Sequence, residues 1–302
     1  MKEIVILSGK GGTGKTSVTA ALAATGPAKV LADCDVDAAD LHLILAPNTH
    51  DIHAFWSGEV ASIDTKACSS CGLCAAKCRF GAIDERLQGY GVNATRCEGC
   101  ALCAYVCPED AVTLSPRLCG EWYESDTRFG PMVHARLGIG QENSGRLVTV
   151  VRNRSRELAE AIDCGTILTD GPPGIGCPVI ASLTNAGLAL LVAEPTRSAQ
   201  HDLERVLHLA NHFRVPCAAI INKSTVNPAM ADAIEAFFEA HSVPVLGRLG
   251  YDPAFTQAQI QGLAVTEYAP DTYLETFATM WEGLQTAMAA APARPTLTAL
   301  HP

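Results

Sequence analysis

A glycine-rich turn between an apolar run and a helix of small residues restricts this chain to few folds. Residues 3–7 (EIVIL) form a continuous β-branched apolar run, which is the pattern of a strand buried on both faces of a parallel sheet. From Thr16 the run TSVTAALAAT predicts a helix packed on that sheet. The turn between them satisfies G-x-x-x-x-G-K-[ST] and reads Gly9-Lys10-Gly11-Gly12-Thr13-Gly14-Lys15-Thr16. This context favours a phosphate-binding loop over a chance match in a glycine-rich turn.

The residue types of this loop assign the expected roles. Glycines let backbone N–H groups converge on phosphate oxygens, and the helix N-terminus adds partial positive charge. Lys15 is expected to reach the β- and γ-phosphates, and the Thr16 hydroxyl is expected to ligate Mg²⁺. The predicted nucleotide-binding residues of the loop are Gly9, Gly11, Gly12, Thr13, Gly14, Lys15 and Thr16.

Strand and helix patterns alternate along most of the remaining chain. Gly26-Pro27 ends the first helix before a second strand, KVLAD. Later strands are predicted at TILTD, LALLVAE and CAAIIN (residues 166–170, 188–194 and 217–222). Helices are predicted at residues 199–213, 228–241 and 271–291. The alternation predicts an α/β fold, a doubly wound and mainly parallel sheet of the P-loop NTPase class.

Carboxylates stand where two of these strands end. Asp170 ends TILTD and precedes a Gly-Pro-Pro-Gly loop, so it is expected to hold the water shell of Mg²⁺. Asp33 and Asp35 end the second strand beside the loop and are expected to orient the attacking water. The alternative for each carboxylate is a helix cap.

The motifs GKGGTGKT, DCD and DGPPGIG together resemble the deviant-Walker superfamily of P-loop ATPases, which includes MinD, ParA and the nitrogenase iron protein. The resemblance implies that Lys10 reaches across an ATP-bound homodimer to the partner's phosphates, which would make Lys10, Lys15 and Asp35 catalytic. It also implies that Asp35 belongs to switch I, Asp170 to switch II, and Asn222 of the INK segment to adenine recognition. A contact of Lys10 with its own nucleotide stays open.

Eight of the thirteen cysteines are concentrated in one stretch of the chain. They form two C-x₂-C-x₂-C-x₃-C runs, the spacing of bacterial two-cluster ferredoxins, in which the fourth cysteine of each run ligates the other cluster. One 4Fe-4S cluster is therefore expected on Cys68, Cys71, Cys74 and Cys107. The other is expected on Cys97, Cys100, Cys103 and Cys78.

Two details qualify this interpretation of the cysteines. Zinc is the competing metal, although zinc ribbons seldom use three linked cysteines twice. Arg79 follows Cys78, whereas the ferredoxin run has proline there. The segments FGAID and EDAVT after the two fourth cysteines repeat a short strand pattern and indicate an internal duplication.

These patterns divide the chain into a P-loop ATPase domain with an insert. The first part is predicted at residues 1–63, and an α+β ferredoxin-like insert with two 4Fe-4S clusters at 64–115. The ATPase domain resumes at 116–290, where residues 116–145 are expected to return the chain to the sheet. Residues 291–302 are expected to be a flexible tail.

Charge and hydropathy limit the partners. Acidic residues outnumber basic ones by 32 to 22, which argues against a nucleic-acid or anionic-membrane surface. The chain has neither a long apolar run nor a signal-peptide pattern, so we expect it to be cytoplasmic. His208 and His212 lie four apart on a predicted helix, and Cys177 follows the switch II loop; we interpret all three as structural.

The combination resembles MinD-superfamily P-loop ATPases that contain an inserted ferredoxin domain. It implies a Mg²⁺-dependent ATPase that binds ATP and ADP, and whose dimerisation controls electron transfer through the two clusters. The expected acceptor is an unknown redox or iron-sulfur protein, with a paralogous ATPase as one candidate. The alternatives are an iron-sulfur assembly or carrier ATPase resembling the Mrp group, and a redox-sensing positioning protein.

Overall fold

The computed structural model describes residues 2–141 and 144–290. They divide into two compact units. The first unit comprises Met1–Asp51, Tyr123–Ala135 and Ser144–Pro302, and the second comprises Ile52–Trp122 and Arg136–Asn143. The second unit has wider bounds than the insert predicted at 64–115. The tail predicted at 291–302 lies outside the described residues.

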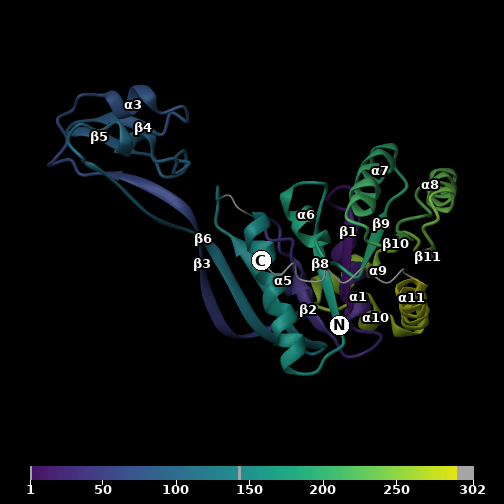
Figure 1. The fold of residues 1–302 in the computed structure, drawn as a ribbon. Coiled ribbons are helices and arrows are strands. Elements are labelled where there is room, and N and C mark those ends of the chain that lie inside the picture. The colour runs from purple at the N-terminus through teal and green to yellow at the C-terminus, as the bar shows by residue number, and fades with distance from the viewer. Residues whose placement is uncertain (1, 142–143, 291–302) are drawn as a thin grey trace, which may run out of the picture. The chain divides into compact units, whose positions relative to one another are not determined.

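Most strands of the nine-stranded sheet are parallel (Figure 1). Its order is β11-β10-β9-β1-β8-β2-β7-β6-β3. The predicted strands are confirmed as β1 (Lys2–Ser8), β2 (Val30–Asp33), β8 (Thr166–Pro173), β9 (Leu188–Ala193) and β10 (Cys217–Ile221). Each pairs in parallel with its neighbours, and β11 (Val245–Arg248) extends the sheet beyond β10. The doubly wound, mainly parallel sheet is therefore confirmed.

Besides β11, three strands of this sheet were not predicted. They are β3 (Asn48–Ile63), β6 (Val112–Thr127) and β7 (Gly130–Leu137), of which β7 pairs in parallel with β2. Residues 116–145, expected to be a connection, thus hold most of β6 and all of β7. The two sixteen-residue strands β3 and β6 escaped prediction because many of their side chains are polar and exposed, so they lack the apolar run of a central strand.

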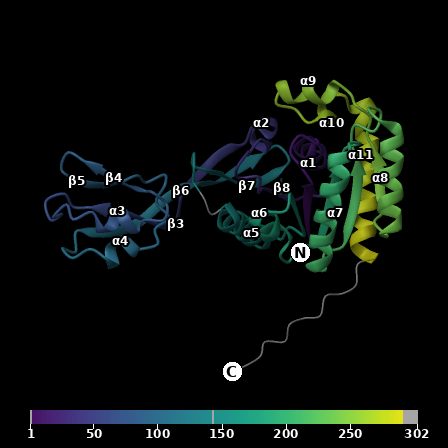
Figure 2. The ribbon, with the colours of Figure 1, turned by 90° about the horizontal axis from the view of Figure 1, so that it is seen from above.

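Helices cover both faces of the sheet (Figure 2). One core joins the sheet to α1 (Lys15–Ala23), α2 (Leu41–Leu45), α9 (Ala254–Ile260), α10 (Val265–Tyr268) and α11 (Pro270–Ala290). The other core joins it to α6 (Cys177–Leu183), α7 (Arg197–His212) and α8 (Pro228–Ala240), and α5 (Ser144–Ala161) packs on α6. Within the described ranges, no helix combines the length and the apolar character that crossing a bilayer requires.

The second unit repeats its own backbone geometry. It contains two short helices, α3 (Leu73–Lys77) and α4 (Leu102–Tyr105), and a hairpin of β4 (Ile83–Arg86) and β5 (Gly89–Val92). Left-handed residues recur in both cysteine runs at the same separation as the cysteines themselves. The corresponding pairs are Ser70 and Gly99, Gly72 and Ala101, and Gly81 and Asp110. This correspondence supports the internal duplication.

Candidate functional site

The glycine-rich loop between β1 and α1 lines a cavity of about 380 Å³ in the first unit. Gly12 and Gly14 have φ angles of 80° and 88°, which side chains other than glycine rarely adopt. A Cβ atom on Gly14 would also collide with the amide nitrogen of Asn222. Helix α1 has no side-chain cap, so its first N–H groups are available to an anion in the cavity.

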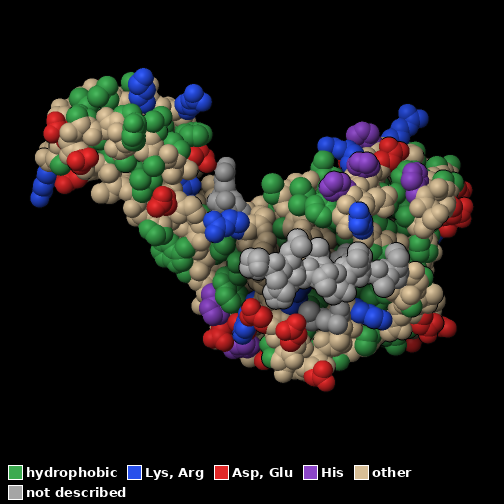
Figure 3. Space-filling view, in the orientation of Figure 1, with side chains coloured by type: hydrophobic (Ala, Val, Ile, Leu, Met, Phe, Trp, Pro, Cys, Tyr) green, Lys and Arg blue, Asp and Glu red, His purple; other side chains and the backbone are tan. Residues whose placement is uncertain are grey.

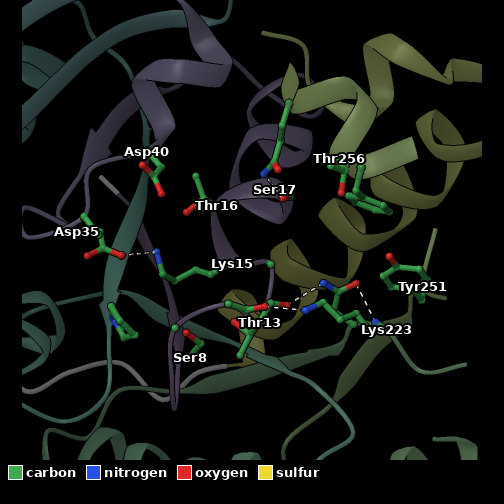
Figure 4. Close-up of a pocket in the computed structure, with 18 of the residues that line it drawn as sticks. Ser8, Thr13, Lys15, Thr16, Ser17, Asp35, Asp40, Lys223, Tyr251 and Thr256 are labelled. Atoms are coloured by element: carbon green, nitrogen blue, oxygen red, sulfur yellow. Dashed lines mark hydrogen bonds and ion pairs between the residues drawn. The ribbon is translucent and has the colours of Figure 1, made fainter. Parts of the chain in front are cut away.

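Lys15 and Asp170 form a buried ion pair beside this cavity. The ammonium Nζ lies 2.8 Å from Asp170 Oδ1 and 3.3 Å from Asp35 Oδ2 (Figure 4 shows Lys15 facing Asp35). Burial alone would lower the pKa of Lys15, but the charges of Asp170 and Asp35 outweigh it and raise that pKa. Lys15 is therefore a fixed cation at the start of α1.

Two hydroxyl groups complete the surroundings of Asp170. Thr19 donates to Oδ1 and Thr16 donates to Oδ2, each at 2.8 Å. The hydroxyl of Thr16 and the carboxylate of Asp170 are thus already paired at the edge of the cavity, and they are the type of oxygen donor that Mg²⁺ prefers. These two residues fit a magnesium ion bound together with nucleotide phosphates.

The two aspartates at the end of β2, Asp33 and Asp35, differ in burial and in pKa. Asp33 lies opposite Asp170 in the β2–β8 register and is fully buried. Burial and the Asp170 carboxylate raise the pKa of Asp33 well above its ordinary value, and its Oδ2 has no hydrogen-bond partner. Asp35 lines the cavity, and burial raises its pKa to about 6 although Lys15 opposes the shift. The Asp35 N–H donates to Asp33 Oδ1, so Asp33 holds the backbone of Asp35 in place.

Lys10 does not line the cavity; it lies against its own chain. Its Nζ is 2.7 Å from Glu194 Oε1, and it donates to the hydroxyl groups of Thr196 and Ser198. Glu194 also pairs with Lys223 at 3.2 Å. Burial alone would raise the pKa of Glu194, but hydrogen bonds from the two lysines prevail and lower it. The side chain of Lys10 is therefore held in an ion pair with Glu194, outside the cavity.

The far end of the cavity contains the predicted residue Asn222 together with residues that the sequence analysis missed. Asn222 donates to the Thr13 carbonyl at 2.8 Å, and Lys223 donates to the Gly12 carbonyl at 2.7 Å. The cavity is also lined by Gly250, Tyr251, Asp252, Phe255, Thr256 and Gln259. Tyr251 and Thr256 lie across it from Lys15 (Figure 4). The sequence contains only a weak indication of these residues, a short strand pattern at β11 followed by Gly250. The carboxyl end of β11 lies at the same edge of the sheet as the phosphate loop.

The eight clustered cysteines line two small cavities of the second unit. The first cysteine set, Cys68, Cys71, Cys74 and Cys107, lines one cavity. The second cysteine set, Cys78, Cys97, Cys100 and Cys103, lines the other. The fourth cysteine of each run thus joins the other run, as in the crossed pairing. All eight are free thiols, and four thiols around each cavity fit the ligand number of a 4Fe-4S cluster.

A site for a single metal ion has a different geometry. Thiolates on one zinc ion, with bonds of 2.3 Å, lie about 3.8 Å apart. Among the described residues, no group of three or more His, Cys, Asp or Glu side chains is arranged to hold one ion, and His208 and His212 on α7 are included in that statement. Cys177 is an exposed free thiol at the start of α6.

Comparisons with known proteins agree with this geometry. The family model described as the CobQ/CobB/MinD/ParA nucleotide-binding domain matches residues 4–265. The uncharacterized protein MJ0578 of Methanocaldococcus jannaschii is 32% identical over 228 residues, which is 74% of this chain and 79% of that protein.

Solved structures share the fold at low sequence identity. The septum site-determining protein MinD of Pyrococcus horikoshii, complexed with Mg-ADP, is 19% identical with a TM-score of 0.54, over 97% of this chain and 99% of that chain. MinD in the MinC:MinD complex of Aquifex aeolicus is 16% identical with a TM-score of 0.56, over 98% of each chain. With its phosphate loop, paired Lys15 and Asp170, and matching family model, the chain belongs to the CobQ/CobB/MinD/ParA family of nucleotide-binding P-loop ATPases.

Proposed function

We propose that this ATPase carries two 4Fe-4S clusters in its second unit and that nucleotide-driven dimerisation controls electron transfer through them. The observation that supports the proposal is the grouping of the eight cysteines. The crossed pairing derived from their spacing and the lining of the two cavities give the same two sets of four. A pair of zinc ribbons would instead keep the cysteines of each run together.

In this proposal, residues of the first unit bind the nucleotide and residues of the second unit bind the clusters. Lys15, the loop amides and the Thr16–Asp170 pair bind and neutralise the triphosphate with its magnesium, and Asp35 orients water. Lys10, once released from Glu194, is available to a second subunit's phosphates. The cysteine sets hold the clusters, which supply one-electron carriers when bound. The acceptor would be a redox protein that docks on the second unit.

The experiment that tests the proposal is metal analysis of protein purified without oxygen. We expect about eight iron atoms per chain with the spectra of 4Fe-4S clusters. Cys107→Ser removes one ligand of the first set and should lower the iron content by about half. Cys119→Ser is the matched control, because Cys119 is buried, donates to the Ser57 carbonyl and lines neither cavity.

Two results would contradict the proposal. Stoichiometric zinc in place of iron would mean that the thiols form single-ion sites. An equal loss of iron in Cys107→Ser and Cys119→Ser would mean that the loss reflects folding and not a missing ligand. Neither result would affect the nucleotide site, which nucleotide binding reports separately.

A further inference from the structure

The duplicated cysteine runs provide an internal comparison of the two cysteine sets. The sets match in burial, since each has one buried, one exposed and two partly buried thiols. They also match in the backbone conformation of the residues around them. Any difference in hydrogen bonding or charge therefore stands out against an otherwise equal background.

Among the residues described, the second set receives more backbone hydrogen bonds on its sulfur atoms than the first set. The Ala82 N–H donates to Cys78 Sγ and the Gly99 N–H donates to Cys97 Sγ, each at 3.4 Å. The equivalent positions in the other run are Ala111 and Ser70, and in the described part of the chain neither donates to a cysteine sulfur. One bond comes from each run, yet both end on the second set, because Cys78 crosses over.

Charge is asymmetric in the same direction. Lys77 and Arg79 flank Cys78, whereas Val106 and Pro108 flank the equivalent Cys107. Both cations are exposed, and Lys and Arg side chains project from the surface of this unit (Figure 3). Arg117 donates to the carbonyl of Cys97, which adds a third cation beside the second set.

Other charges nearly balance. Lys66 precedes Cys68 of the first set by two residues. Glu98 lines the cavity of the second set, and Glu109 lines that of the first, so the carboxylates cancel. Arg96 precedes Cys97 of the second set but pairs with Asp84. The remaining cations, three near the second set against one near the first, leave a net positive difference.

We propose that the second cysteine set holds the cluster of higher reduction potential, so that an electron delivered to the second unit comes to rest there. Reduction adds one electron and no proton. Hydrogen-bond donors and cations around the thiolates stabilise the added negative charge, which raises the potential. This inference rests on the proposed function and identifies the cluster of higher potential as the one from which the acceptor takes the electron. The electron comes from a low-potential one-electron donor.

The test is a redox titration of the purified chain with dithionite, followed by electron paramagnetic resonance. We expect two one-electron steps whose equilibrium constants differ by about tenfold or more, which is 59 mV per tenfold. The double variant Lys77→Gln, Arg79→Gln should lower the equilibrium constant of the higher-potential step by about threefold. The shift is modest because exposed charges are screened. The lower step should stay in place.

The reciprocal variant places charge beside the first set. Val106→Lys should raise the reduction potential of the lower step and narrow the difference between the two potentials. Arg154→Gln in the first unit should leave both potentials unchanged. Coincident steps in protein with about eight iron atoms would overturn the inference, as would a shift of the lower step in the Lys77 and Arg79 variant. Protein without iron would overturn the proposed function itself, so the two failures are distinguishable.

Discussion

At the scale of single residues, the nucleotide site is set by a few buried polar contacts. Asp170 receives hydrogen bonds from Lys15, Thr16 and Thr19. The sequence predicted Lys15, Thr16 and Asp170 as members of one nucleotide and magnesium site, but not these contacts between them. Motif spacing works here because the loop and the strand end are adjacent in the parallel sheet. Lys223 and Tyr251 reach the same cavity from strands far along the chain, where no spacing rule links them to the loop.

The two lysines of the loop should differ when each is replaced. Lys15→Ala should weaken ATP binding strongly, because it removes the cation inside the cavity. Lys10→Ala should spare most ATP binding by the monomer but abolish ATP-dependent dimerisation and turnover. Calorimetry for binding, and light scattering with a non-hydrolysable analogue for dimerisation, measure the two effects.

Lys15→Ala leaves buried Asp170 without its cation, which costs about 3–5 kcal/mol in such pairs, so thermal unfolding without nucleotide is the necessary control. Normal ATP hydrolysis by Lys10→Ala would rule out the role of Lys10 across a dimer.

At the scale of elements, one arginine joins three segments of the first unit. Arg128, in the turn between β6 and β7, donates to the Leu45 carbonyl at 2.7 Å and the Ile44 carbonyl at 3.0 Å at the end of α2. It also pairs with Glu267 of α10 at 2.7 Å and donates to the Gly262 carbonyl after α9. Sequence patterns did not reveal this connection, because β6 and β7 lack the apolar signal of strands. Arg128 thereby links the end of α2 to the segment after α9, the helix that lines the far end of the cavity.

Replacing Arg128 should weaken the binding of the nucleoside part of ADP but not the binding of its phosphates. Arg128→Met keeps much of the apolar stem but removes every hydrogen bond, so we expect ADP affinity to fall about tenfold, or about 1.4 kcal/mol. Pyrophosphate affinity should be unchanged, because the phosphate loop does not contact Arg128. Titration calorimetry with both ligands distinguishes the two.

Arg154→Met is the matched control, since Arg154 also pairs with two carboxylates, Glu124 and Glu157, but touches neither α2 nor α9. Equal losses for ADP and pyrophosphate would point to general destabilisation instead of positioning.

At the scale of the whole molecule, the chain enters the second unit shortly after α2 and leaves it directly before α5. β3 starts directly after α2, which follows Asp35, and α5 starts at the return from the second unit. A Cβ atom on Gly145 in α5 would lie 3.3 Å from the Cβ atom of Cys177, the first residue of α6. The motifs predicted the two switches, whereas these packing contacts depend on tertiary structure that no local pattern encodes.

Nucleotide state should therefore alter the second unit. We expect the reduction potentials or the chelator accessibility of the clusters to differ between protein with Mg-ADP and protein with Mg²⁺ and a non-hydrolysable ATP analogue. The Lys15→Ala variant should show no difference. Identical values for wild-type protein in the two states would remove the coupling.

The raised pKa of buried Asp33 has a consequence for the arrival of nucleotide. A triphosphate brings several negative charges to a wall where three strand-end aspartates gather, and every ionised one repels it. Burial and the Asp170 carboxylate raise the pKa of Asp33, which favours its neutral form, and Lys15 pairs with both Asp170 and Asp35. The protein thus presents an incoming anion with a shallower electrostatic barrier than its acidic composition implies.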